Sequence, residues 1–181
     1  MKSQDIIVLL KLALLHQRNN GHENIMADAF SVRGLEGSLG ISKSEVNASI
    51  KRSIESGLAL KERHSDHPKA NLKALIEFII YGLRYVFPVK PGAMVRGIPT
   101  AAAAPVLKGE LHSVGEHICV WPDPEGKEMG QSLNPLFKSA PFAAKQDHDL
   151  YDLLALVDAI RLGNPRESKL AQSLLEQRLE A

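Results

Sequence analysis

The stretch from Leu39 to Leu58 carries side chains whose chemistry suits nucleic acid. Lysine and arginine neutralise phosphates, whereas serine and asparagine bond to phosphates and to base edges. Val46, Ile50 and Ile54 recur every four residues and predict an inward apolar seam on one helix. The polar side chains that then fall mostly on the other faces of this helix are Lys43, Ser44, Asn47, Lys51 and Arg52.

The neighbouring segments predict how this helix is positioned. The stretch "SVRGLEGSLG" indicates a short helix that turns Leu35 and Leu39 inward and ends at Gly40. Ser42 and Glu45 have the spacing of a capping box, which predicts the start of the helix at 42–56. The alternating residues of "LALKER" predict a short strand, followed by a turn at "HSDHPK".

Several side chains near that turn are further candidates for phosphate or minor-groove contacts. They are Lys61, Arg63, His64 and Lys69. The predicted helix itself is barely basic, because Glu45 and Glu55 offset its cations, so binding would depend on the turn and on dimerisation. A solvated charged hairpin would explain any one of the turn residues equally well.

The bulk composition favours an intracellular protein without a membrane anchor. The net charge is +1, so a nucleic-acid binder would have to gather its cations on one face. The single cysteine, Cys119, has no partner in the chain, which fits a reducing compartment. The sequence predicts neither a signal peptide nor a membrane span, and the expected location is the cytoplasm.

Proline placement divides the chain. Eight of the ten prolines fall between Pro88 and Pro141, and none precedes Pro68. Because proline removes a backbone donor and fixes φ, helices are expected on both sides of an irregular middle segment. We therefore predict a mainly α fold with two parts, 1–70 and 71–181, the second of which contains the Pro-rich segment 88–141.

Outside the first segment the expected elements are mostly helices. Asn71 predicts the cap of an apolar helix that stops at Phe87, because Pro88 disfavours helical backbone before it. Two short strands are expected around "HICVW" and "GQSL", with "DPEG" as the turn between them. The remaining expected helices begin near Ser3, near His148 and at Pro165.

The order helix, glycine turn, capped helix, strand and turn in residues 31–63 is the layout of a winged helix-turn-helix. Leu35–Leu60 resembles bacterial winged helix-turn-helix transcription regulators of the MarR-like kind. The segments "YGLRYVFPVKPGAMVRGIPTAAAAP" and "VWPDPEG" are similar to those of a small group of such regulators. The resemblance implies a recognition helix at 42–56, a wing near 60–70 and a homodimer. Glu36 departs from the pattern, which usually has alanine there.

Other polar residues are candidates for a ligand site or for a structural role. In "RGIPT", Arg96 and Thr100 could bind a phosphate or carboxylate in a Gly/Pro-framed loop, with Trp121 as a stacking surface. An arginine that ties irregular backbone carbonyls together explains the motif at least as well. Arg84 is expected to pair with an acidic residue in the fold or in a dimer.

Neither a metal site nor a catalytic site is expected. His112, His117 and Cys119 fall short of the four ligands of a structural zinc site. The phosphate-loop, nucleophile-elbow and zinc-protease motifs are missing from the sequence. The predicted function is a sequence-specific regulator, in the form of a dimeric repressor bound to double-stranded DNA, with no cofactor. The alternative is an antitoxin-like protein partner that neutralises an enzyme and could also bind its own promoter. Sensing of a small-molecule effector through residues 88–134 is compatible with the DNA-binding function.

Overall fold

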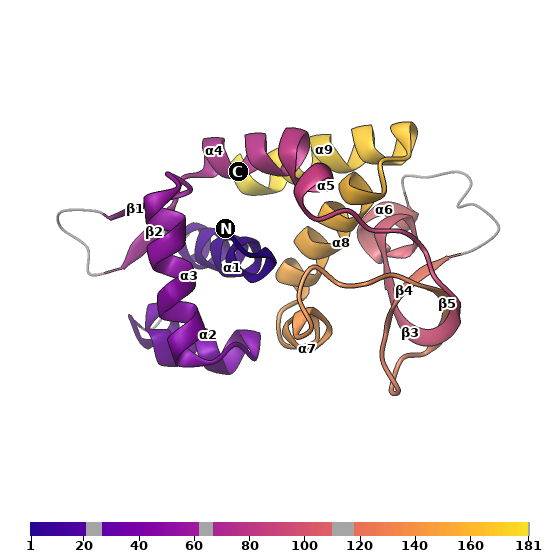
Figure 1. Cartoon of the computed structure of the whole chain (residues 1–181), viewed down its shortest axis with the longest axis horizontal. Coiled ribbons are helices and arrows are strands. Elements are labelled where there is room, and N and C mark those ends of the chain that lie inside the picture. Colours follow the sequence, from indigo (N-terminus) through magenta and orange to yellow (C-terminus); the bar gives the residue numbers. More distant parts are fainter. Residues whose placement is uncertain (21–26, 62–66, 110–117, 181) are drawn as a thin grey trace.

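The computed structural model describes residues 1–20, 27–61, 67–109 and 118–180 (Figure 1). The chain is mainly helical, with one two-stranded sheet and one three-stranded sheet. Of the predicted site residues, Arg63 and His64 lie outside the described ranges, as do His112 and His117. Within these ranges, no helix is both long and apolar enough to cross a membrane.

Two helices, α1 (Ser3–Asn20) and α8 (His148–Leu162), run through the interior. Every residue of α1 from Gln4 to Leu15 is buried, and so are most residues of α8. A helix that is apolar around its circumference must be covered on all sides, and the other elements surround this pair (Figure 1). The helix that the sequence predicts to begin near Ser3 is therefore covered on all sides from Gln4 to Leu15.

The N-terminal elements pack on one side of α1. In chain order they are the 3₁₀ turn η1 (Ala27–Phe30), α2 (Val32–Leu39), α3 (Lys43–Glu55), β1 (Ala59–Lys61) and β2 (Pro68–Ala70). The strands β1 and β2 form an antiparallel pair in which Ala59 lies opposite Ala70. The short strand predicted in "LALKER" is present as β1. Residues 64–66 of the turn predicted at "HSDHPK" lie outside the described residues, and its last two, Pro68 and Lys69, belong to β2.

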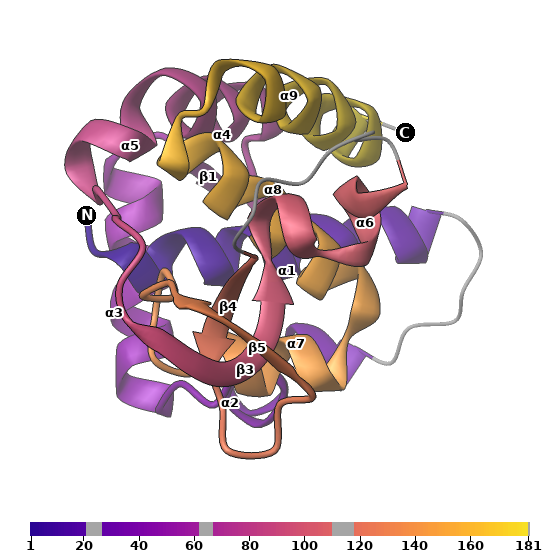
Figure 2. The same ribbon diagram turned by 90° about the vertical axis from the view of Figure 1, so that its right-hand side faces the viewer.

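The predicted apolar helix after Asn71 is one continuous helix with a wider turn inside it. It comprises α4 (Leu72–Glu77), the π-helical turn η2 (Phe78–Gly82) and α5 (Leu83–Val86). The Asn71 side chain accepts a hydrogen bond from the backbone N–H of Ala74, as expected for its cap. The final helix α9 (Pro165–Glu180) lies beside α4 in both views (Figures 1 and 2).

The Pro-rich middle segment contains a small three-stranded barrel. Its strands are β3 (Met94–Thr100), β4 (Cys119–Pro122) and β5 (Glu128–Ser132), and β3 pairs antiparallel with both others. The "RGIPT" segment, which was expected to be a loop, is part of β3. The short helices η3 (Ala101–Ala103), α6 (Pro105–Lys108) and α7 (Ala140–Gln146) flank the barrel and α8.

Two glycines explain how so small a barrel closes. A Cβ on Gly126 would lie 2.4 Å from the Cα of Gly97, and a Cβ on Gly97 would lie 2.0 Å from the carbonyl oxygen of Trp121. Backbone segments can approach this closely only where no side chain intervenes. The glycines of "RGIPT" and "DPEG" therefore allow β3 to pack against the 123–127 turn.

A single hydrophobic cluster spans the two predicted parts of the chain. It contains Leu10 of α1, Val46 of α3 and Leu156 of α8. A buried ion pair also joins α1 to α8, since Nζ of Lys11 lies 2.7 Å from Oδ2 of Asp147. The division at residue 70 remains a prediction from the sequence, whereas the core itself is continuous.

Candidate nucleic-acid interface

A tight turn joins α2 to α3. Gly40 adopts left-handed backbone with φ of 64°, and its N–H donates to the carbonyl of Glu36. Leu35, Leu39 and Val46 are fully buried where the two helices meet. The glycine is needed because this conformation is costly for a residue with a Cβ. The predicted glycine turn is thus present at Gly40.

The start of α3 is capped differently from the sequence prediction. The Ser42 side chain makes no capping hydrogen bond, and Glu45 turns toward α1, where it accepts from Gln4. Glu36 of α2 takes over this role by accepting from the backbone N–H of Lys43 at 3.3 Å. The residue that departs from the family pattern therefore satisfies a helix-start donor across the turn.

The buried side of α3 also differs from the predicted seam. Ile54 is 37% exposed, while Ser49 and Ser53 are buried. Each four-residue step turns about 40° beyond a full circle, so Ile54 lies about 80° away from Val46. The small serines instead face the interior, where they leave room for close packing of α3 on α1.

Arg52 makes intramolecular ion pairs that the sequence did not predict, and its contact with DNA stays a prediction. Its Nε and Nη2 donate to the carboxylate of Asp5 at 3.0 and 2.6 Å, and Nη2 also donates to Glu45 at 2.6 Å. These hydrogen bonds, first of all the one to Asp5, raise the pKa of Arg52, and the one from Arg52 lowers the pKa of Glu45. Arg52 therefore fastens α3 to α1.

Replacing Arg52 by methionine should lower the free energy of unfolding by about 2–4 kcal/mol, because the carboxylate of Asp5 stays buried without its cation. Asp5 is only 1% exposed. Chemical denaturation followed by circular dichroism measures this change. The neighbouring Lys51→Met substitution is the matched control and should alter stability by less than about 0.5 kcal/mol. Equal stability of both variants would contradict the structural role of Arg52.

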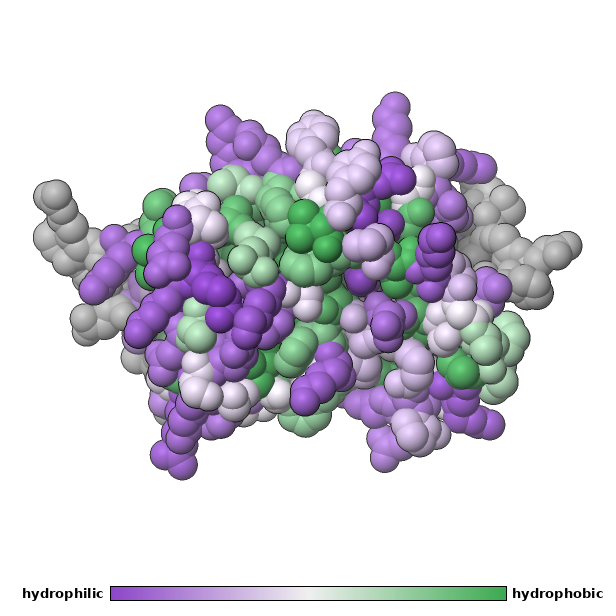
Figure 3. Space-filling model, in the orientation of Figure 1, coloured by the Kyte–Doolittle hydropathy of each residue, from purple (hydrophilic) through white to green (hydrophobic). Residues whose placement is uncertain are grey.

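The outward face of α3 carries the rest of the predicted set. The side chains of Lys43, Ser44, Asn47 and Lys51 are all exposed. Figure 3 shows hydrophilic side chains gathered over this part of the molecule. Nζ of Lys43 lies 3.8 Å from a carboxylate oxygen of Glu36, a solvent-exposed pair of little energetic weight. This face can accept hydrogen bonds and can donate them without disturbing the core.

The β1–β2 pair is held at a defined place beside α3. The Asn71 side chain donates to the carbonyl of Gly57 at 3.0 Å, and its backbone N–H donates to the carbonyl of Leu58 at 2.9 Å. Lys61 is exposed at the end of β1, whereas Lys69 of β2 is half-buried. The start of β1 and the end of β2 therefore lie next to the C-terminal end of α3.

The other candidate set lies elsewhere and is built around a residue that the sequence did not single out. Asp158 of α8 is 1% exposed and accepts from Oγ1 of Thr100 at 2.9 Å and from Nε1 of Trp121 at 2.6 Å. Nη1 of Arg161 donates to the same carboxylate at 2.6 Å. The sequence does contain a pattern that could have identified Asp158, namely an aspartate within the apolar run "LLALVDAI". A carboxylate buried in such a run needs hydrogen-bond or ion-pair partners.

Thr100 and Trp121 are therefore structural: they join the barrel to α8. Arg96 is not part of that network. It is exposed on β3, and its Nη1 donates to the carbonyl of Gly126 at 3.4 Å. Arg96 thus bonds to a backbone carbonyl, which is the structural role that the sequence suggests for it, although its side chain is exposed.

Cys119 and Arg84 both line a cavity that lies between α5, the end of α8 and the barrel. Burial, followed by the nearby Asp158 and Glu167, raises the pKa of the Cys119 thiol. Arg84 makes no ion pair with any described residue, so an acidic partner within the described fold is not found, and a partner in a dimer stays a prediction. Its Cζ atom lies 5.4 Å from the centre of the Tyr85 ring. In the described ranges, no group of three or more metal-ligating side chains is found.

Comparison of the chain with protein-family models, with curated proteins and with solved structures finds no match. The function has to be inferred from the geometry of the chain itself.

Proposed function

We propose that the chain is a sequence-specific DNA-binding transcriptional regulator with α3 as its recognition helix and β1–β2 as its wing. The supporting observation is the outward face of α3, where Lys43, Ser44, Asn47 and Lys51 are exposed while the opposite side is buried. A helix of 13 residues is about 20 Å long. With its side chains an α-helix is about 10–12 Å across, so it fits a major groove about 12 Å wide.

Each side chain on this face has a role in the proposal. Asn47 is suited to the paired donor and acceptor of adenine, and Ser44 to either kind of base edge. Lys51 would neutralise a phosphate, as would Lys61 at the start of the wing. Lys43 would exchange its exposed pair with Glu36 for a phosphate.

The proposed regulator is intracellular and acts as a homodimer. A net charge of +1 provides little attraction for DNA, so one copy would bind weakly. Tyr81 and Tyr85 are each 74% exposed on the helix that contains η2 and α5, and Val86 is 52% exposed. Tyrosines of this kind are enriched in protein interfaces. Two copies could place their α3 helices in successive major grooves.

Binding of fluorescent duplex DNA at about 50 mM salt tests the proposal. The Asn47→Ala/Lys51→Ala variant should bind at least about tenfold more weakly, because it loses a base contact and a phosphate contact. The slope of log Kd against log salt should also decrease by about one, for the lost lysine contact. Selection from a random duplex pool then identifies the preferred site.

Lys127→Ala, at an exposed position on the turn before β5, is the matched control and should leave DNA affinity unchanged. Arg52 is left intact in all variants, because changing it would confound binding with stability. Failure of the wild-type chain to bind any duplex at low salt would contradict the proposal. So would equal affinity of the α3 variant and the control.

The second candidate is a protein-binding partner of the antitoxin kind, and the exposed Tyr81 and Tyr85 favour it. Such a chain would keep its partner when Lys51 is changed and lose it when Tyr85 is replaced by serine. Sedimentation of the same samples measures whether these tyrosines join two copies of the chain.

A further inference from the structure

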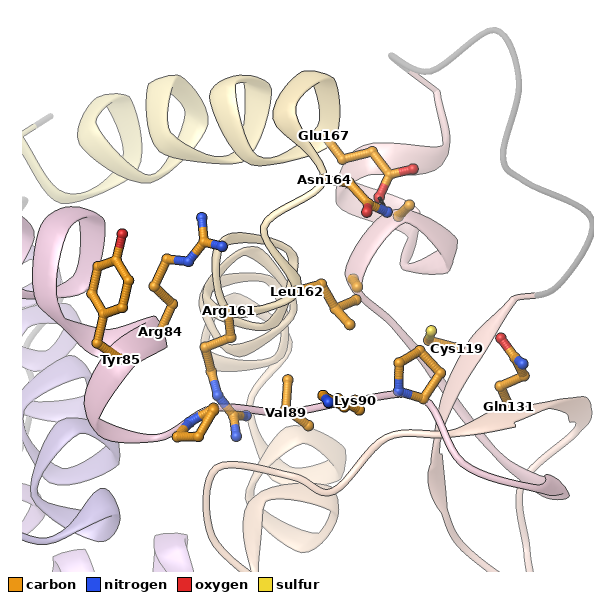
Figure 4. A pocket seen from close by; sticks show the side chains of 14 residues that line it. Arg84, Tyr85, Val89, Lys90, Cys119, Gln131, Arg161, Leu162, Asn164 and Glu167 are labelled. Atoms are coloured by element: carbon orange, nitrogen blue, oxygen red, sulfur yellow. Dashed lines mark hydrogen bonds between the residues drawn. The ribbon is translucent and has the colours of Figure 1, made fainter.

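A cavity of about 480 Å³ opens between α5, the end of α8 and the barrel. Figure 4 shows Arg84 and Tyr85 entering it from α5, and Arg161 and Leu162 from the last turn of α8. Cys119 and Gln131 line it from β4 and β5. Its volume lies within the roughly 300–1,000 Å³ of small-molecule sites, and it is separate from α3 (Figure 1).

The charged groups of this cavity are mostly cationic. Arg84, Lys90 and Arg161 line it, against the single carboxylate of Glu167. That carboxylate is already engaged, since Nδ2 of Asn164 donates to it at 3.0 Å. Arg84 and Lys90 form neither a hydrogen bond nor an ion pair with any residue that the structure describes. Among the described residues, the cavity therefore presents two cations without an ion-pair partner, Arg84 and Lys90, and one carboxylate, that of Glu167.

Arg161 provides a more deeply buried donor. It is only 6% exposed, its Nε donates to the carbonyl of Phe87 at 3.0 Å and its Nη1 donates to Asp158. Its Nη2 makes no hydrogen bond to a described residue. This atom is not one of the buried side-chain atoms that lack a partner; since Arg161 lines the cavity, Nη2 can donate a hydrogen bond to an oxygen atom of a bound anion.

The position of Arg84 depends on the turn between α8 and α9. Gly163 there has φ of 74°, and a Cβ on it would lie 2.8 Å from Cζ of Arg84. The guanidinium group thus rests directly on the glycine backbone, with the ring of Tyr85 on another side. Both contacts hold the cation at the cavity wall.

The remaining lining is largely apolar and includes Val89, Leu162, Ala101 and Ala102. Inorganic phosphate would leave these surfaces uncovered, whereas a molecule with an apolar body would cover them. We propose that the cavity binds a small organic anion, whose acidic group is held by Arg84, Lys90 and Arg161 and whose apolar body packs against Val89 and Leu162. No residue of α3 lines this cavity. The test of anion binding is therefore independent of the test of DNA binding.

Cys119 provides a direct readout, because it is the only cysteine of the chain and lines the cavity. The probes are phenylacetate and phenyl phosphate, with phenylacetamide as the uncharged analogue of similar shape. Alkylation of the intact chain by neutral iodoacetamide is followed by mass spectrometry. The buffer is alkaline, at about pH 9, because the thiolate is the reacting species and the pKa of the Cys119 thiol is raised.

A bound anion at five times its Kd should slow alkylation roughly sixfold, since only the free fraction reacts. Phenylacetamide should leave the rate unchanged. Protection by phenylacetate alone assigns a carboxylate ligand, and protection by phenyl phosphate alone assigns a phosphate ester. Arg84→Gln should weaken binding of the protecting anion by about tenfold or more, whereas Lys127→Gln, outside this cavity, should not.

Three results would overturn the proposal. They are equal protection by phenylacetamide, absence of protection by both anions, and unchanged affinity in Arg84→Gln. Because Arg84 is exposed, its replacement should leave the fold intact, which circular dichroism of the same sample checks.

Discussion

Replacing Asp158 by alanine should lower the free energy of unfolding by about 3–5 kcal/mol, because the buried Arg161 loses its counter-ion. Thr100 and Trp121 lose their shared acceptor at the same time. The carboxylate is 1% exposed and joins β3 and β4 to α8. Burial raises the pKa of Asp158, although Arg161, Trp121 and Thr100 act in the opposite direction. Urea denaturation measures the loss.

Two further variants keep this expectation testable if the alanine variant fails to fold. Thr100→Val removes one donor with little change of shape and should cost about 1–2 kcal/mol. Asp149→Ala, at an exposed position on the same helix, should cost less than about 1 kcal/mol. An Asp158 variant as stable as the Asp149 variant would show that the buried network contributes little.

The second large effect concerns Asp147, at the start of α8. Asp147→Ala should lower the free energy of unfolding by about 3–5 kcal/mol near neutral pH, because Lys11 remains buried without a carboxylate. The Nζ atom of Lys11 and Nη2 of Arg18 each lie 2.7 Å from this carboxylate. Asp149→Ala again serves as the control, since Asp149 bonds to Arg18 but is largely exposed.

The same contribution should depend on pH. Burial alone would raise the pKa of Asp147, but hydrogen bonds from Arg18 and Lys11 outweigh it and hold that pKa well below its usual range. The stabilisation is therefore complete above the unfolded pKa of about 3.9 and is lost as the pH falls toward the folded value. The difference between wild type and Asp147→Ala should shrink from about pH 7 to about pH 2.5. A difference independent of pH would contradict this origin.

The sequence by itself determined the longer helices and several of their ends. Gly40, the Asn71 cap and Pro88 mark boundaries through local backbone chemistry, and the apolar periodicity placed the long helices. The exposed residues of α3 were also predictable, because a helix with one buried side must turn its other side outward. Such features depend on residues only a few positions apart.

Tertiary structure alone decided the partners of the charged side chains. Arg52 meets Asp5 across 47 positions, Lys11 meets Asp147 across 136, and Glu36 rather than Ser42 satisfies the start of α3. The three-stranded barrel likewise pairs segments that are far apart in the chain, through close approach at Gly97. The attraction between opposite charges depends on their distance in the folded chain. Sequence spacing does not determine this distance for residues on different helices, because the packing of the helices sets it.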